Sequence, residues 1–132
     1  NGYIYSSDLS RGLDLLELTP SEFLSANELA AAKLARMEEY NPQMQPKVTW
    51  PAAFPVVRSY LDQLVRNNGL AAARTTAIAT ALNNAERARG ATRRQQLNAL
   101  ATQLDRDAAG ASDAARVRAM AAAVRDLANA SR

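Results

Sequence analysis

The apolar residues of the first 18 positions follow a strand pattern. Tyr3 to Ser7 is rich in β-formers, and Leu13 to Leu18 alternates partly between apolar and polar side chains. Between them, Asp8 to Gly12 has the composition of a turn, and its closing glycine suits a residue with positive φ. The pattern predicts a β hairpin over residues 1–18. Because two strands alone bury too little apolar surface to be stable in water, we expect it to pack on more sheet or on a helix.

A helical pattern follows the hairpin. Thr19 is a candidate N-cap, Pro20 suits the first helical position, and Glu22 completes a capping box. Apolar side chains then recur at helical spacing, at Phe23, Leu24, Leu29, Ala30, Leu34 and Met37. Because Pro42 disfavours helical geometry before it, the pattern predicts a helix over residues 20–39, inside a helical segment 19–40.

Residues 41–55 hold four of the five prolines of the chain, which predicts an extended linker with polyproline character. Trp50 and Phe54 interrupt this segment, which we otherwise expect to be exposed. They have two interpretations: anchors that fix the linker on a neighbouring helix, or an exposed aromatic pair that binds a partner. We take both residues forward as candidate partner-binding residues.

Four helical patterns separated by glycines follow the linker. The first ends near Gly69 and the second near Gly90, each glycine a plausible C-terminal cap. Thr92 with Gln95 forms a capping box for the third, which stops by Gly110, and Ser112 is the expected cap of the fourth. The apolar stripes contain Val57, Tyr60, Leu61, Leu64, Val65, Leu70, Ala77, Ile78, Ala81, Leu82, Ala85, Leu97, Leu100, Ala101, Leu104, Ala108, Val117, Met120, Val124 and Leu127. This spacing predicts an antiparallel four-helix module over residues 56–132, so the fold class is mainly α, with a leading hairpin and helix.

Alanine determines the packing that we expect. Apolar residues make up 48% of the 132 residues but only 5% are aromatic, so the core is thin and its helices are closely set. We therefore expect modest stability. The costly truncations should lie at Leu61, Leu82, Leu100, Leu104 and Val124, at roughly 2–4 kcal/mol each.

The residues that enzymes use most often for catalysis are missing. The chain has no Cys and no His, which removes thiolate chemistry, disulfides, the commonest metal ligand and the commonest general base. Neither Glu38 with Glu39 nor Asp105 with Asp107 can converge on one site from a helix, and Asp8 and Asp14 lack the spacing of a calcium loop. We therefore predict no enzyme activity, no catalytic residue, no cofactor and no metal. No window is long and apolar enough to predict a membrane span.

Charge is distributed unevenly along the chain. Residues 1–68 carry six basic and eight acidic side chains (−2), and residues 69–132 carry ten arginines and five acids (+5), which together give the net charge of +3. The basic half alone would suggest an anionic partner, but acidic residues are interspersed with the arginines, which favours ordinary solvated helix faces. Arg93 and Arg94 stand where the helix dipole disfavours cations, so we predict that they serve solubility or a partner rather than the helix.

Residues Gly2 to Leu18 resemble the closing segment of LVIVD-repeat β-propeller proteins, in which a strand ends at a short loop before a strand of Leu-x-x-x-Asp type. Here the second strand is Leu-Asp-Leu-Leu-Glu-Leu at positions 13–18. The resemblance spans less than one blade and implies that the remaining blades lie upstream. The absence of an initiator Met and of an export pattern fits that expectation.

The segment from Val57 to Ala130 is similar to the FIMAH-like helical modules at the ends of secreted bacterial proteins. The matching stretches are residues 57–64, 82–88 and 94–100, although the His and the Phe-rich positions of that type are missing. The resemblance implies export to the extracellular space or the bacterial cell surface, and a binding or spacing role.

Three functions follow from these expectations. The favoured one is a noncatalytic interaction or spacer module at the C-terminus of an exported β-propeller protein, with a protein or a neighbouring β domain as partner. The second is a structural subunit of a cell-surface or extracellular assembly, in which the hairpin edge pairs with a neighbour by self-assembly. The third, less favoured, is a basic helical nucleic-acid-binding module, which would need the arginines of residues 74–132 to gather on one face.

Overall fold

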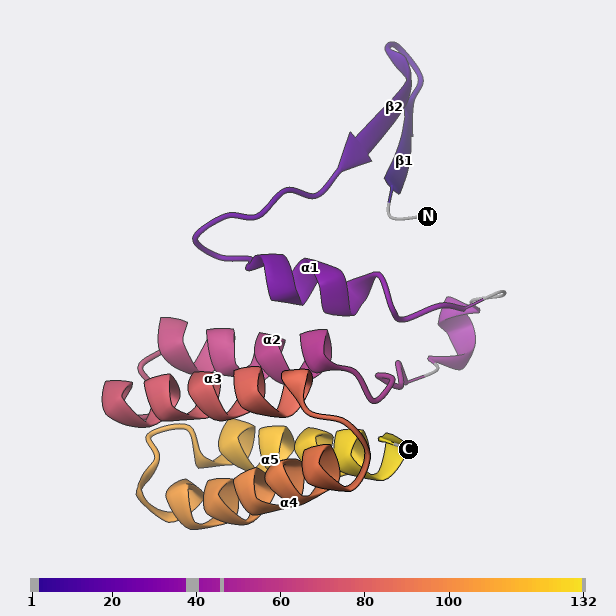
Figure 1. The fold of residues 1–132 in the computed structure, drawn as a ribbon. Helices are drawn as coiled ribbons and strands as arrows, with labels where there is room; N and C mark the ends of the chain where they lie inside the picture. The colour runs from indigo at the N-terminus through magenta and orange to yellow at the C-terminus, as the bar shows by residue number, and fades with distance from the viewer. Residues whose placement is uncertain (1–2, 38–40, 46, 132) are drawn as a thin grey trace.

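The computed structural model describes residues 3–37, 41–45 and 47–131. A two-stranded hairpin and a short helix precede a bundle of four longer helices (Figure 1). The fold is mainly α, as the sequence predicts.

The hairpin consists of β1 (Tyr3–Asp8) and β2 (Gly12–Glu17), paired antiparallel with Tyr3 opposite Glu17 and Asp8 opposite Gly12. Gly12 has φ 92°, which confirms the expected positive φ at the end of the turn. The Asp8 carboxylate accepts hydrogen bonds from the backbone N–H of Ser10 at 2.8 Å and of Arg11 at 3.1 Å. The turn is therefore held by its own first residue.

Helix α1 (Ala26–Ala32) is shorter than predicted and begins later. The predicted capping box of Thr19 and Glu22 is wrong. Ser25 is the N-cap: its hydroxyl accepts from the Glu28 N–H at 3.1 Å, and the Glu28 carboxylate accepts from the Ser25 N–H at 2.7 Å. The capping box of Ser25 and Glu28 forms instead, because the Glu28 carboxylate also pairs with a side chain of the bundle, as described below. The predicted helical positions 33–37 lie beyond the end of α1, and positions 38–40 lie outside the described residues.

The proline-rich linker contains one 3₁₀ turn, η1 (Pro42–Met44), and ends earlier than predicted. Helix α2 (Phe54–Arg66) already includes Phe54, with Pro55 in its first turn. Proline is well tolerated there because the first N–H groups of a helix have no intrahelical partner.

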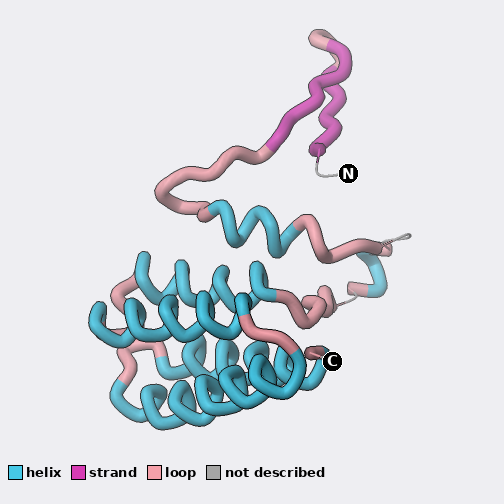
Figure 2. The backbone as a smooth tube through the Cα atoms, viewed as in Figure 1, coloured by secondary structure: helices cyan, strands magenta, loops and turns pink. Residues whose placement is uncertain are grey.

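The bundle contains α2, α3 (Ala72–Arg87), α4 (Gly90–Asp107) and α5 (Ala114–Ala130), with a 3₁₀ turn η2 (Ala108–Gly110) between the last two. Short turns make successive helices antiparallel (Figure 1). Each helix packs on two neighbours, because α2 contacts α5 as well as α3, and α4 contacts both α3 and α5. The four helices therefore form a closed ring, and α1 lies outside it, against α2 (Figures 1 and 2).

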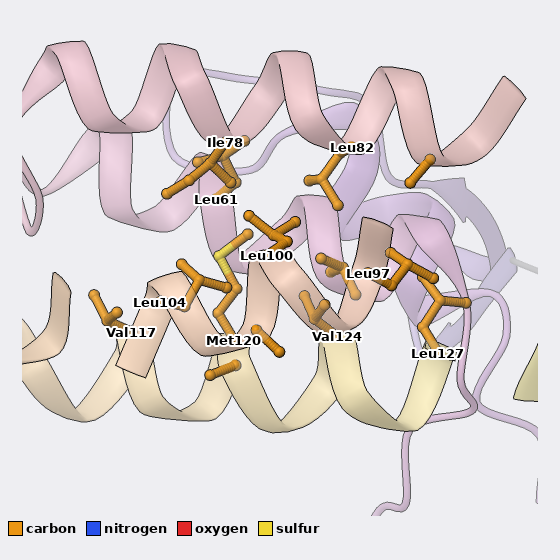
Figure 3. Close-up of a cluster of buried hydrophobic side chains, with 14 of the residues drawn as sticks. Leu61, Ile78, Leu82, Leu97, Leu100, Leu104, Val117, Met120, Val124 and Leu127 are labelled. Atoms are coloured by element: carbon orange, nitrogen blue, oxygen red, sulfur yellow. The ribbon is translucent and has the colours of Figure 1, made fainter. Parts of the chain in front are cut away.

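The bundle core is aliphatic. Figure 3 shows leucines, valines, Ile78 and Met120 from all four helices pointing toward one another. The largest fully buried side chains are Leu64, Ile78, Leu82, Leu97, Leu104, Met120, Val57, Val117 and Val124. The predicted stripes are confirmed at these positions. The prediction is wrong for Ala77, which is exposed, and for Val65, of which 55% is exposed. Val65 lies at the edge of the α2 stripe, in the last turn, where no neighbouring helix covers it.

The predicted caps of the bundle helices need correction. After α2, Asn68 takes the positive φ of 51°, and the Gly69 N–H reaches back to the Leu64 carbonyl at 2.8 Å, as in a Schellman motif. Gly90, with φ 52°, opens α4 instead of closing α3, so the predicted capping box of Thr92 and Gln95 is wrong. Asp113 rather than Ser112 caps α5, since its carboxylate accepts from the Arg116 N–H at 3.0 Å and also pairs with the Arg116 guanidinium at 2.9 Å.

Candidate interaction surfaces

Large apolar side chains are exposed almost entirely in residues 3–50. Of the 15 large hydrophobic residues that are exposed in the described part of the chain, 14 lie in that segment, and Val65 is the exception. The bundle, in contrast, buries its large apolar side chains. We call residues 3–50 the N-terminal arm.

The hairpin carries apolar side chains on both faces. Successive residues of a strand point to opposite faces. With the observed register, Leu13 and Leu15 share one face, whereas Ile4 and Leu16 stand opposite each other on the other face. Ile4 is 46% exposed, Leu15 58% and Leu13 71%. Among the described residues neither strand packs against a helix, and the hairpin projects away from the bundle (Figure 1).

Among the described residues, a single ion pair joins the arm to the bundle. The Arg66 guanidinium donates two hydrogen bonds to the Glu28 carboxylate, at 2.8 and 2.9 Å. These hydrogen bonds outweigh the opposing effect of burial and lower the pKa of Glu28 to about 2. Asn27 adds a hydrogen bond to Asp62 of α2 at 2.9 Å. Since Glu28 also completes the capping box of α1, one carboxylate both caps the N-terminus of this helix and binds it to α2. The sequence contained the signal Ser25-x-x-Glu28, which we missed in favour of the earlier box.

Trp50 and Phe54, predicted as a pair, lie in different surroundings. Phe54 is half-buried and packs against the bundle core, with the Arg93 guanidinium 5.8 Å from the centre of its ring. Trp50 is 45% exposed and lines a pocket between the linker and the bundle. The structure therefore does not bring the two aromatic side chains into one exposed patch. Phe54 therefore lies where an anchor of the linker is expected, whereas the Trp50 side chain remains partly accessible to a partner.

Arg93 and Arg94 have partners within the bundle. The Arg93 guanidinium donates to three carbonyls at the end of α3, those of Ala85 at 3.2 Å, Ala88 at 2.9 Å and Glu86 at 3.1 Å. Arg94 donates to the Ser131 carbonyl at the end of α5, at 3.2 Å. Each arginine thus stabilises the C-terminus of a neighbouring antiparallel helix, where a cation is favoured. Sequence reasoning considered only their own helix and missed this role.

The remaining arginines of the basic half are spread over several helices. Arg74 pairs with Asp107 at 2.6 Å, Arg116 pairs with Asp113, and Arg125 pairs with Asp105. Arg87, Arg89, Arg106 and Arg118 have no ion pair among the described residues. Three of the ten arginines of residues 69–132 therefore have an acidic partner among the described residues.

The carboxylates do not gather into a site within the described residues. No group of three or more potential metal ligands occurs there, Asp105 and Asp107 each pair with an arginine, and Asp8 holds the hairpin turn. Glu38 and Glu39 lie outside the described residues. No described helix is long and apolar enough to cross a membrane.

A shallow groove of about 360 Å³ lies between α3 and α4. Ile78 and Leu100 belong to its lining, together with Ala77, Ala81 and Ala99. Nothing in the described part of the chain covers it.

No protein-family model matches the chain, and no curated protein or solved structure shows significant similarity to it.

Proposed function

We propose that the chain is a noncatalytic interaction module in which the bundle is a stable carrier and the N-terminal arm docks on a β-structured neighbour. The observation that carries the proposal is the distribution of exposed apolar side chains, 14 of 15 of which belong to residues 3–50. Exposed apolar surface on this scale marks an interaction site.

The hairpin supports a β-structured neighbour in particular. A two-stranded sheet leaves both outer edges available for further strands, and isolated hairpins are marginally stable in water. Apolar side chains on both of its faces fit a sheet that is covered on each side. A neighbour that extends the sheet and packs against its faces would satisfy both features.

In its favoured form, the proposal places the module at the C-terminus of an exported β-propeller protein, on the bacterial surface or outside the cell. The resemblance of residues 2–18 to LVIVD repeats supports the propeller, and the FIMAH-like layout of residues 57–130 supports export. The hairpin would then belong to the sheet of a blade, and the bundle would be a binding or spacing arm.

Mass spectrometry of the protein in its source tests this form. Peptides that precede Asn1 and carry further repeats of Leu-x-x-x-Asp type are the expected result. A mature protein whose first residue is Asn1 would overturn the propeller form, and the hairpin would then have to dock on another chain.

The outer strand edges of the hairpin also favour a second candidate, a structural subunit of a surface assembly. Sedimentation of the purified chain tests it. Assembly through the hairpin should be weakened by Leu15→Lys and left intact by Val65→Lys, which places the same charge on an exposed residue of the bundle. Equal effects of the two substitutions would contradict assembly through the hairpin.

A further inference from the structure

A half-open pocket of about 470 Å³ lies between the linker before α2 and the face formed by α2 and α5. One wall is the linker itself, from Lys47 to Ala53. The other side is formed by Val56 and Tyr60 of α2 and by Ala119, Ala122, Ala123 and Asp126 of α5. This volume is within the range of small-ligand sites.

The α5 side of the pocket contributes small side chains and one negative charge. Ala119, Ala122 and Ala123 lie on one face of the helix, and Asp126 continues that face one turn further. The alanine methyl groups leave room above the helix, while the carboxylate provides a negative charge at one side of that room. Asp126 has no ion-pair or hydrogen-bond partner among the described residues, so its charge remains available to a ligand.

Two aromatic side chains form another part of the pocket lining. Trp50 from the linker and Tyr60 from α2 both line the pocket, Trp50 with 45% of its surface exposed and Tyr60 half-buried against the core. Faces of Trp and Tyr rings attract cations, and an alkylammonium group gains both from the ring faces and from contacts with apolar walls. Aromatic rings, alanine methyl groups and an unpaired carboxylate together match the chemistry of an organic cation.

Lys47 is the other charged residue of the lining. It is exposed and forms no ion pair with Asp126, so it does not neutralise that carboxylate directly. Its positive charge opposes the binding of a cation. Removing Lys47 and removing the charge of Asp126 should therefore change the affinity for a cation in opposite directions.

We propose that this pocket binds a small organic cation that carries an alkylammonium group, with Trp50 and Tyr60 against the cation and Asp126 as its counter-charge. No residue of the hairpin lines the pocket, so the inference does not depend on what the hairpin binds.

Trp50 is the single tryptophan of the chain, so its fluorescence reports on the pocket directly. Choline chloride is titrated into the full chain. Sodium chloride at equal ionic strength and 3,3-dimethylbutanol, the neutral analogue of choline with the same shape, serve as controls. We expect a saturable change with choline, none with sodium chloride, and weaker binding of the neutral alcohol. The absence of a saturable change, or equal binding of choline and the alcohol, would overturn the proposal.

Charge variants complete the test, with circular dichroism to confirm that each is folded. Asp126→Asn should weaken choline binding about 3- to 10-fold, and Lys47→Gln should strengthen it. Tyr60→Phe retains the ring and should preserve binding. Asp14→Asn, the matched control, removes a carboxylate from the hairpin and should leave binding unchanged. An unchanged affinity in Asp126→Asn, or a loss equal to that of the control, contradicts the role of Asp126.

Discussion

The carbonyl oxygen of Gly69 accepts a hydrogen bond from the backbone N–H of Asp113, with an N···O distance of 3.0 Å. This bond joins the turn after α2 to the start of α5, two segments far apart in the sequence. Gly69 is buried, and its own N–H bonds to the Leu64 carbonyl at 2.8 Å. One residue therefore closes α2 and positions the first turn of α5.

A side chain at position 69 should disturb this junction. A Cβ there would approach Leu64 Cδ2 to 2.8 Å and Asp113 Cβ to 3.0 Å, and Leu64 is fully buried and has little room to move. We expect Gly69→Ala to lower the free energy of unfolding by about 1–3 kcal/mol in urea denaturation. Gly110→Ala is the control: a Cβ at Gly110 meets nothing within 4 Å, so stability should stay the same or rise slightly.

Glu28→Gln should release α1 from the bundle without unfolding the bundle. The substitution removes the charge that pairs with Arg66, and a seven-residue helix is too short to persist alone. Hydrogen exchange of residues 26–32 should accelerate, while exchange in α3 to α5 stays slow. Glu22→Gln is the control, because Glu22 is exposed and precedes α1. Equal acceleration in both variants would contradict the docking role of Glu28.

The docking of α1 should also depend on pH. The pKa of Glu28 is lowered from 4.5 to about 2 by Arg66, so the carboxylate is stabilised in the docked state. This contribution is fully present above about pH 4.5 and is lost as the pH falls toward 2. Exchange of the α1 amides, corrected for the intrinsic pH dependence, should therefore rise across that interval in the natural chain. In Glu28→Gln the rise should be absent.

Arg93→Met should destabilise the bundle by about 1–2 kcal/mol, measured by thermal or urea unfolding. Methionine retains an apolar stem but cannot donate to the three carbonyls that end α3. Arg93→Lys should recover little, since a single ammonium lacks the planar fork of the guanidinium. Arg89→Met, at an exposed arginine with no ion pair among the described residues, should have almost no effect. Similar losses at both positions would mean that capping is unimportant.

Leu82→Ala should cost about 3 kcal/mol of stability, because Leu82 is fully buried among the four helices. Val65→Ala should cost little, since 55% of Val65 is exposed although it belongs to the predicted apolar stripe. Urea titration of both variants separates a buried position from an exposed one. A large loss at Val65 would show that another surface covers it in solution.

The sequence predicted the elements of the bundle better than their ends. Apolar spacing identified Leu64, Leu82, Leu104 and Val124 as core residues because burial repeats with the helical period. The caps were less predictable. Ser112 has a suitable side chain, but Asp113 caps α5 because its carboxylate also forms an ion pair with Arg116. Thr92 also has a suitable side chain, but α4 already begins at Gly90.

The interaction surfaces were harder to predict because they depend on partners distant in sequence. The stacking of Arg93 on Phe54 and the pairing of Glu28 with Arg66 each join segments that no local pattern connects. Trp50 was selected as an aromatic residue in a proline-rich linker, and this was sufficient to identify one residue of the pocket wall. Tyr60 and Asp126 complete that pocket only after the helices have packed.

The closed ring of helices gives the bundle a property beyond packing. Phe54 at the start of α2 and Ser131 after α5 line the same cavity, so the two ends of the ring lie close together at one end of the bundle. A short peptide could join them, and a circular permutant opened at the exposed turn around Gly110 should keep the same core. The bundle therefore has the geometry of a cassette that can be inserted into a surface loop of another protein without separating the two sides of that loop.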